Sequence, residues 1–353
     1  MGEFPKIPGY KIQKKIGEGA TANIYYAIQS NLDREVAIKV FKPGFEDNSV
    51  YVRRFIKEAR IVSKLYHPNI VTIHDVGKSG NFHYIVMEYL EESLRDKLNS
   101  HGRLPVKEVL RIFKPVARAL KFAHSKKVVH RDIKPGNILF RKDGTPVIAD
   151  FGLAKDMDAG TTLAEAGMIL GTPAYMSPEQ CKGERGDYLS DIYSLGVVLY
   201  AMLSGEVPYM SKDYRKILDV HINSPIPPLP RELRKFQPLI EWMMAKNKKE
   251  RLHDLNEAVK QLKQLIYGDD VEITVESFPV SWERNIKIKQ IWQVIALIIL
   301  LLSLLVLLYF VKLKFLGTID GNANSPISKN VRQQTDISAV GKNSRQETVA
   351  NEV

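Results

Sequence analysis

The stretch from Val128 to Gly152 constrains the chain most, because two short apolar runs flank a dense set of polar residues. The runs Val128–Val129 and Pro146–Ala149 have the composition of short buried strands. A turn at Lys142-Asp143-Gly144 precedes the second run. We therefore expect a loop between strands that exposes its polar side chains at one place.

The polar residues of this stretch have the chemistry of phosphoryl transfer. Asn137 lies five residues after Asp132, and Asp150 follows the second apolar run. Asp132 supplies a carboxylate that can orient a hydroxyl group, and the oxygens of Asn137 and Asp150 suit a hard cation such as Mg²⁺. Lys134 can place a point charge on a transferring phosphoryl group.

These residues resemble the catalytic loop and metal-binding motif of protein kinases at every defining position, in His130-Arg131-Asp132-Ile133-Lys134-Pro135-Gly136-Asn137 and Asp150-Phe151-Gly152. The resemblance covers Tyr10 to about Tyr267. It implies an α+β, two-lobed fold with a small β-rich N-terminal lobe holding one helix and a larger helical C-terminal lobe. It also implies ATP and Mg²⁺ (or Mn²⁺) as cofactors, with Asn137 and Asp150 as metal ligands.

Three features before residue 60 follow one another in the order found in the N-terminal part of a protein kinase: a glycine turn, a lysine in a strand and a glutamate in a helix. A strand from Tyr10 to Ile16 leads into a glycine turn, where the third glycine of the family pattern is Ala22 and the next valine is Ile24. Lys39 interrupts an apolar strand, and Glu58 lies in a segment with helical apolar spacing. Taken alone, the glycine turn is more typical of an ordinary structural turn, Lys39 of a solvated lysine and Glu58 of an exposed glutamate. By resemblance, the turn covers the phosphates, Lys39 grips them and Glu58 orients Lys39.

The run Met87-Glu88-Tyr89-Leu90 resembles the hinge between kinase lobes, whose backbone binds adenine. Apolar residues before and after it would sandwich the base, as in most ligand pockets. The nucleotide-binding residues implied by the resemblance are Ile16, Gly17, Glu18, Gly19, Ala22, Ile24, Ala37, Lys39, Met87, Glu88, Leu90, Asn137, Leu139 and Asp150. Those implied to act in catalysis are Asp132, Lys134, Lys39 and Glu58.

The segment after Asp150 predicts regulation and substrate class. Leu153 to Leu170 has activation-loop length and holds Thr161 and Thr162, which we expect to be phosphorylated and to pair with Arg131. The platform Gly171 to Glu179 and Lys134 are serine/threonine-kinase forms. The resemblance therefore implies transfer of the γ-phosphoryl group of MgATP to protein Ser/Thr hydroxyls.

Structural roles follow for the C-terminal half of the implied domain. By resemblance, Glu179 pairs with Arg251, and Asp191 braces the catalytic loop. An amphipathic helix over Val106 to Ser125 should kink or restart at Pro115. Another, over Asp254 to Tyr267, should close the fold.

Residues 291–311 carry no charge, and only Gln293 and Ser303 are strongly polar. As a helix these residues span about 32 Å, the thickness of bilayer hydrocarbon. Trp292 and Tyr309 lie near the ends, as interfacial anchors do, and lysines flank the run. The pattern predicts a single transmembrane helix.

This helix divides the chain into a kinase domain (10–267), a juxtamembrane linker (268–290), the transmembrane helix (291–311) and a polar tail (312–353). Met1 to Lys15 lacks the apolar core of a secretory signal, and ATP is cytosolic. We therefore expect a single-pass protein of the cytoplasmic (inner) membrane, with the kinase domain in the cytoplasm and a short, disordered extracytoplasmic tail. The whole resembles a bacterial, membrane-anchored, eukaryotic-like (Hanks-type) kinase in membrane-linked signalling, and a homodimer is one expectation.

Composition narrows the alternatives. The net charge is +11, but Lys and Arg are spread along the chain, which favours ATP and an anionic membrane surface over nucleic acid. A single cysteine, Cys181, excludes intrachain disulfides and multi-cysteine zinc sites. Three readings stay open beside a protein kinase: a small-molecule phosphotransferase, an ATP-binding membrane scaffold without turnover, and an adaptor that docks without ATP.

Overall fold

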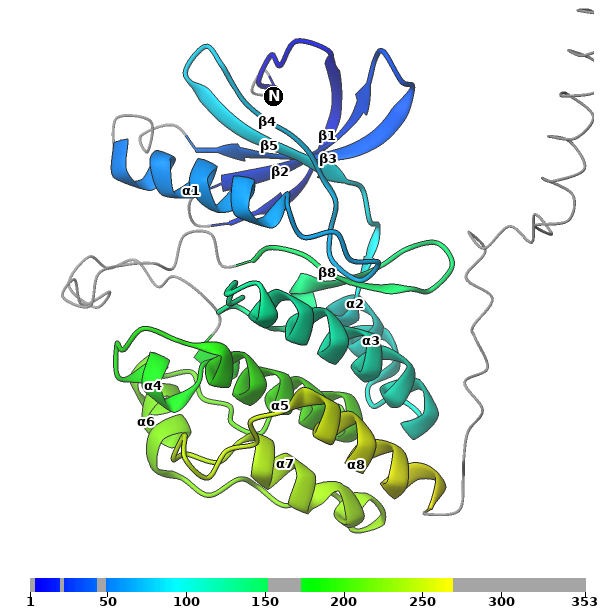
Figure 1. Ribbon diagram of the computed structural model, residues 1–353, viewed down its shortest axis with the longest axis vertical. Helices are drawn as coiled ribbons and strands as arrows, with labels where there is room; N and C mark the ends of the chain where they lie inside the picture. The colour runs from blue at the N-terminus through cyan, green and yellow to red at the C-terminus, as the bar shows by residue number, and fades with distance from the viewer. Residues whose placement is uncertain (1–3, 20–21, 43–48, 152–172, 269–353) are drawn as a thin grey trace, which may run out of the picture. The chain divides into compact units, whose positions relative to one another are not determined.

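The computed structural model describes residues 4–19, 22–42, 49–151 and 173–268, except the side chains of 49–51, 53–55 and 58. These residues form a sheet-rich N-terminal lobe and a helical C-terminal lobe, as the sequence predicts (Figure 1). Thr161 and Thr162, the linker from residue 269 onward, the predicted helix 291–311 and the tail lie outside the described residues.

The N-terminal lobe is a five-stranded antiparallel sheet of order β1-β2-β3-β5-β4. Alternating apolar residues bury one face, where Val36, Ile38 and Val40 of the third strand pack together with Tyr25 and Val86. The strands are β1 (Tyr10–Glu18), β2 (Ala22–Gln29), β3 (Arg34–Phe41), β4 (Ile73–Ser79) and β5 (Phe82–Glu88).

The opposite face of the sheet carries the residues predicted to meet the nucleotide. Ile24 pairs with Lys39, and Ala37 pairs with Met87. Because directly paired residues of antiparallel strands point to one face, these side chains share a surface. The helix α1 (Ser49–Val62) packs on this face through Ala59.

The C-terminal lobe is built around α5, whose residues from Leu189 to Leu203 are all buried. A helix that is buried on every side belongs in the interior, and the helices α3 and α7 pack against it (Figure 1). The helices are α2 (Leu94–His101), α3 (Val106–Ser125), α4 (Pro178–Cys181), α5 (Tyr188–Ser204), α6 (Tyr214–Asn223), α7 (Gln237–Met243) and α8 (Leu255–Tyr267), with short 3₁₀ turns η1 (Pro135–Asn137), η2 (Pro173–Tyr175) and η3 (Arg231–Phe236).

A small three-stranded sheet carries the catalytic stretch. Its strands are β6 (Glu92–Ser93), β7 (Ile138–Phe140) and β8 (Pro146–Ile148), in the order β6-β7-β8. The expected apolar run at 146–149 thus forms a strand, whereas the short run Val128–Val129 does not.

Of the two outcomes expected at Pro115, the restart is wrong, because α3 runs unbroken from Val106 to Ser125, and the kink stays a prediction. Proline removes one hydrogen bond to the preceding turn. The buried side of α3, which includes Phe113, Val116 and Leu120, keeps its packing on both sides of the proline. Tertiary burial outweighs this local cost.

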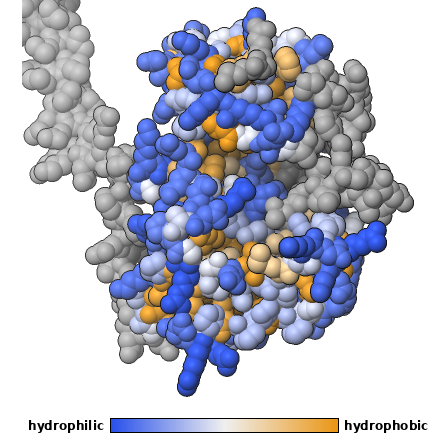
Figure 2. All heavy atoms as spheres, turned by 180° about the vertical axis from the view of Figure 1, so that it is seen from behind, coloured by the Kyte–Doolittle hydropathy of each residue, from blue (hydrophilic) through white to orange (hydrophobic). Residues whose placement is uncertain are grey.

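On the face turned away from Figure 1, hydrophilic side chains cover much of the surface and apolar residues show between them (Figure 2). Among the residues that the structure describes, no helix combines the length and the apolar character needed to cross a membrane.

Candidate active site

The catalytic loop brings three predicted residues into direct contact. Lys134 Nζ donates to Asp132 Oδ2 at 2.8 Å. Asn137 Nδ2 donates to the main-chain oxygen of Asp132 at 2.7 Å and to its Oδ2 at 3.1 Å. The turn η1 folds the chain back over these residues, with Pro135 at its first position, where the missing N–H costs nothing. The carboxylate of Asp132 is therefore held in one orientation beside a cation.

A second contact joins the two lobes across this loop. Lys39 of β3 donates from Nζ to Asp150 Oδ1 at 2.7 Å, although the residues lie 111 positions apart. Both side chains are partly shielded, with 17% and 30% of their surfaces exposed. Glu58 lies in α1, but its side chain is outside the described part of the chain, so its pairing with Lys39 stays a prediction.

Two non-glycine residues of the site adopt left-handed backbone conformations. Arg131 has φ 62° and Asp150 has φ 55°. Such conformations cost about 1–3 kcal/mol each and persist where the surroundings fix them, often at functional sites. Arg131 directly precedes the predicted base Asp132, and Asp150 is itself a predicted metal ligand.

Asp191, at the start of α5, fixes the strained loop. Its Oδ2 accepts from the main-chain N–H of His130 at 2.8 Å, and its Oδ1 accepts from that of Arg131 at 2.7 Å. His124 Nε2 lies 2.8 Å from Oδ2, and Asp191 is fully buried. The prediction that Asp191 braces the catalytic loop is confirmed.

His130 connects the catalytic loop to the strand that ends at Asp150. Its Nδ1 accepts from the N–H of Asp132 at 3.2 Å, so Nε2 carries the proton and donates to Ala149 O at 3.0 Å. Burial lowers the pKa of His130, which favours the neutral imidazole. No separate role was predicted for His130, although a histidine directly after an apolar run and two residues before the catalytic Asp was a usable signal.

We expect Asp191→Asn to lower both stability and phosphate transfer. An amide offers one acceptor oxygen where the carboxylate offers two, so one of the two loop N–H groups loses its partner, at about 1–3 kcal/mol. Thermal unfolding and transfer rate check this against Asp187→Asn, the N-cap of the same helix, whose side chain contacts neither loop N–H. An Asp191→Asn protein with the wild-type rate and melting temperature would contradict the bracing role.

The nucleotide residues predicted from the sequence lie on both sides of the hinge. Met87, Leu90 and Leu139 pack against the buried cluster of Val71, Val147 and Ala149. From the other side come Ile24 and Ala37, which share the sheet face with Lys39. Ile16 is exposed, at the end of β1. The predicted apolar residues are thus contributed by both lobes.

The glycine turn is closed by a short backbone bond. Gly19 N donates to Ala22 O at 2.8 Å, while Gly17 pairs with Ile24. Glu18 accepts from Lys15 at 2.6 Å and from Lys42 at 2.7 Å. Hydrogen bonds from these two lysines lower the pKa of Glu18 to about 2. The Glu18 side chain therefore anchors the turn, and its predicted contact with nucleotide stays a prediction.

A residue without a sequence-based role, Arg141, holds the hinge. Its Nε and Nη2 donate to the two carboxylate oxygens of Glu88 at 3.0 and 2.9 Å. Glu88 also accepts from the N–H of Thr72, and its own N–H donates to Thr72 O. This two-point pair fixes the hinge to the end of β7. The sequence offered only a weak indication of this pairing, namely an arginine directly after a short apolar strand.

Asn137 and Asp150 fit a magnesium ion by the chemistry of their donors. The Nδ2 of Asn137 is engaged with Asp132, which leaves its Oδ1 as the acceptor. Among the described residues there is no group of three or more His, Cys, Asp or Glu side chains able to hold a metal. Mg²⁺ is commonly bound through one or two carboxylates together with substrate phosphates, so one carboxylate and one amide suffice.

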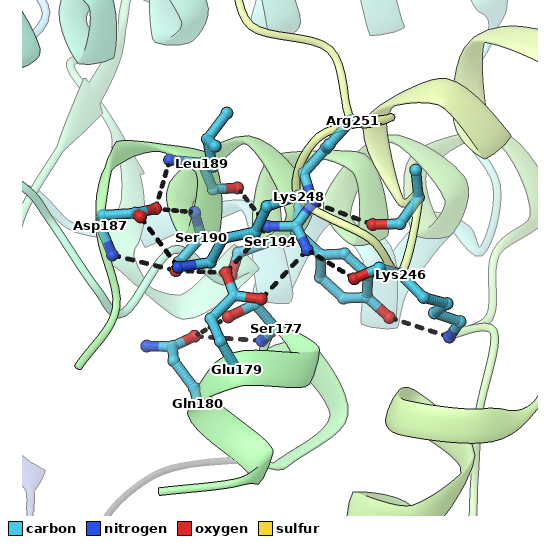
Figure 3. Close-up of polar contacts among 12 residues, drawn as sticks. Ser177, Glu179, Gln180, Asp187, Leu189, Ser190, Ser194, Lys246, Lys248 and Arg251 are labelled. Carbon is cyan, nitrogen blue, oxygen red and sulfur yellow. Dashed lines mark hydrogen bonds and ion pairs between the residues drawn. The ribbon is translucent and has the colours of Figure 1, made fainter. Parts of the chain in front are cut away.

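A buried ion pair locks the C-terminal lobe below the site (Figure 3). Arg251 Nη1 and Nη2 donate to Glu179 Oε1 and Oε2 at 2.8 and 3.0 Å, as predicted. Ser190 Oγ also donates to Glu179 at 2.6 Å. The neighbouring Gln180 donates to Arg131 O at 3.0 Å, which ties this cluster to the catalytic loop. Gln180 was missed, although Ser177 and Gln180 carry the spacing of a capping box.

Similarity to known proteins agrees with this geometry. The chain is 39% identical over 245 residues to the serine/threonine-protein kinase PknA of Mycobacterium tuberculosis, covering 67% of this chain and 57% of PknA. It is 40% identical over 219 residues to the serine/threonine-protein kinase PrkC of Bacillus subtilis, covering 62% of this chain and 34% of PrkC. The chain therefore spans less than two thirds of either relative.

The solved kinase domain of PknI from Mycobacterium tuberculosis shares the fold, with a TM-score of 0.59 at 23% identity, covering 75% of this chain and 100% of that one. The family model described as "Protein kinase domain" matches residues 10–265. With this match and the contacts among Lys39, Asp132, Asn137 and Asp150, the chain belongs to the protein kinase family.

Proposed function

We propose that this protein is a serine/threonine protein kinase that transfers the γ-phosphoryl group of MgATP to hydroxyl groups of proteins. The observation that carries the proposal is the arrangement of Asp132, held by Lys134 and Asn137, beside the Lys39–Asp150 pair. In this proposal Asp132 is the proton acceptor, Lys134 and Lys39 are the cations that act on phosphate, and Asn137 and Asp150 are the metal-ligand pair. PknA and PrkC, which bear the name of serine/threonine kinases, support the acceptor class.

The mechanism is mainly positioning and electrostatics. Asp132 orients the acceptor hydroxyl and takes its proton, while Lys134 stabilises the charge of the migrating phosphoryl group. Lys39 holds the phosphates from the sheet of the N-terminal lobe. Asn137 and Asp150 would hold Mg²⁺, which would supply positive charge to offset the negative charge of the phosphates.

Incubation with γ-labelled ATP, Mg²⁺ and a general protein substrate tests the proposal. We expect label on serine or threonine of the substrate, and none with Lys39→Met protein, because the phosphates lose their cation. Tight ATP binding without any transfer by the folded wild type would instead favour a scaffold that binds ATP.

We also propose that phosphorylation of Thr161 or Thr162 activates the enzyme. Arg131 precedes the catalytic Asp132 and can form charge-assisted hydrogen bonds with a phosphate. We expect the doubly substituted Thr161→Ala/Thr162→Ala protein to lose most of its activity, by about tenfold or more, since one such contact is worth about 1.5–3 kcal/mol. Phosphopeptide mapping and initial rates measure this, with Thr145→Ala in the β7–β8 turn as control. A fully active double variant would contradict it.

We propose further that residues 291–311 anchor the protein as a single membrane helix, with the kinase domain in the cytoplasm. The uncharged run and its flanking lysines and aromatic residues support the proposal. Dimerisation through this helix is part of it. Fractionation of cells expressing the full chain, beside a chain that ends at Gln290, tests it: only the full chain should sediment with membranes.

A further inference from the structure

The side of α3 that faces away from the core carries a row of basic residues. Five Lys or Arg residues recur at intervals of four and three residues, and the helix holds a single acidic residue, Glu108. At about 100° per residue, the five fall within an arc of about 80°, opposite the buried side that includes Phe113, Val116 and Leu120. The row extends about 21 Å along the helix. We call it the basic stripe; its members are Lys107, Arg111, Lys114, Arg118 and Lys121.

Most of the charge of the basic stripe is not balanced within the described structure. Lys107, Lys114 and Arg118 form no ion pair or side-chain hydrogen bond with any residue that the structure describes. The two other members have one acidic partner each, at 3.6 Å for Arg111 and 2.7 Å for Lys121. Neighbouring cations on one helix face repel one another, because their separation is shorter than the screening length of physiological salt. A surface with many negative charges would relieve this repulsion.

A second helix brings a further cation to the basic stripe. The helix α8 packs along α3 (Figure 1). Its residue Lys263 is half-buried, as is Lys114 of the stripe. Burial lowers the pKa of Lys114, and the charges of Arg118 and Lys263 lower it further. Cations therefore gather where each makes the next less favourable, unless negative charge is supplied from outside.

The chain leaves the described domain beside the basic stripe. Asp254, the N-cap of α8, pairs with Lys121 near the end of α3. Because α8 packs along α3 from this point, it runs back toward the start of α3 and ends there at Tyr267. The 22 residues 269–290 then lead to the run proposed as a membrane helix. They reach at most about 75 Å, so the proposed anchor keeps the stripe near the bilayer surface.

An exposed aromatic side chain lies near the other end of the basic stripe. Tyr66 is 86% exposed. The ring of His67, the next residue, lies 5.2 Å from the ring of Phe122 in the last turns of α3. Tyrosine is enriched where membrane headgroups meet hydrocarbon, and lysine and arginine together with aromatic residues are typical of segments that bind a membrane surface. This combination and the nearby anchor favour a lipid surface over a nucleic acid.

We propose that the basic stripe of α3 binds anionic headgroups of the membrane in which the protein is anchored, and thereby fixes the orientation of the kinase domain against the bilayer. Guanidinium and ammonium groups bind lipid phosphates by charge-assisted hydrogen bonds. Each Lys or Arg near an anionic surface strengthens the binding about fivefold. The inference rests on the proposed membrane helix, which supplies the tether, and goes beyond it by naming the docking surface and the class of lipid.

Lysine footprinting of the full chain tests the inference. The wild type is reconstituted into nanodiscs of phosphatidylcholine, alone or mixed with the anionic lipid phosphatidylglycerol, and its lysines are acetylated with an uncharged reagent and quantified by mass spectrometry. We expect Lys107 and Lys114 to react about fivefold or more slowly in the anionic discs. Lys142, which is 90% exposed in the β7–β8 turn, should react equally in both. High salt should remove the difference, because it screens the charges.

A pair of matched variants locates the effect. The Lys107→Glu/Arg118→Glu protein should lose the protection of Lys114, which it retains as the reporter. Both substituted side chains are exposed, so the melting temperature should stay close to that of the wild type. The Lys78→Glu/Lys249→Glu protein undergoes the same change of net charge at exposed lysines elsewhere and should keep the protection.

Equal acetylation of Lys107 and Lys114 in neutral and anionic discs would overturn the inference alone, as would protection that survives in the Lys107→Glu/Arg118→Glu protein. Protection by a DNA duplex but not by anionic discs would assign the stripe to nucleic acid and overturn it as well. A full chain that enters neither kind of disc would overturn the membrane helix together with the inference that depends on it.

Discussion

The Asp132→Asn protein should transfer phosphate about 10²- to 10⁴-fold more slowly than the wild type, the usual loss when a positioned general base is removed. An amide keeps the shape of the side chain but cannot take the hydroxyl proton. Lys134 and Asn137 both donate to Asp132 Oδ2, and an amide can still accept from them through its one oxygen. The fold and the affinity for ATP should therefore be preserved.

Initial rates with saturating ATP, and ATP affinity on the same samples, measure this effect. Asp143→Asn is the matched control, because Asp143 lies in the β7–β8 turn, where it accepts from the N–H of Thr145. It should keep the wild-type rate. A rate for Asp132→Asn within about threefold of the wild type would contradict the role of Asp132 as the base.

The second large effect concerns stability, where Arg251→Met should lower the free energy of unfolding by about 3–5 kcal/mol. Glu179 is 4% exposed and Arg251 is 1% exposed, so removing the guanidinium leaves a buried carboxylate without its counter-charge. Arg251 also donates to Ala245 O and Leu189 O, which lose their donor. Equilibrium unfolding in denaturant measures the loss.

A surface pair provides the control. Lys121 and Asp254 form an ion pair at 2.7 Å, with 45% and 54% of their side chains exposed. Lys121→Met should cost less than about 1 kcal/mol, because solvent screens the pair. Equal losses for Lys121→Met and Arg251→Met would contradict the view that burial makes the Glu179–Arg251 pair decisive.

The buried Glu179–Arg251 pair predicts that the stability of the fold depends on pH. Burial by itself would raise the pKa of Glu179, but hydrogen bonds and charge from Arg251 outweigh it and lower the value from 4.5 to about 2. Because the folded pKa lies below the unfolded one, the stabilisation is present above about pH 5 and is lost as the pH falls toward 2. In that interval Arg251→Met protein should lose less stability than the wild type.

Much of the fold and of the site could be predicted because the necessary residues are neighbours in sequence or follow a fixed order. Asp132, Lys134 and Asn137 fall within one short loop, so their spacing alone brought them together. The pairing of Glu179 with Arg251 and the bracing by Asp191 came from family resemblance, and both are confirmed. Strands and helices followed from apolar periodicity, which burial in the structure reproduces.

What the sequence could not predict depends on tertiary contacts between polar residues without a motif. Nothing in the spacing of Arg141 and Glu88 marks a two-point ion pair across 53 positions. The approach of Arg95 to Gly136 requires the docking of α2 on the catalytic loop. The helix restart expected at Pro115 does not occur, because packing on both sides of the proline, which the sequence does not display, keeps α3 continuous.

The most direct test of the central claim is one experiment on full-length wild-type and Asp132→Asn protein. ATP affinity and the rate of γ-phosphate transfer to a threonine-containing protein are measured side by side in the presence of Mg²⁺. We predict equal affinities, with transfer by the wild type and a loss of about 10²- to 10⁴-fold in the variant. Tight ATP binding by both proteins, with no transfer by either, would contradict a kinase and indicate a protein that binds ATP without turnover.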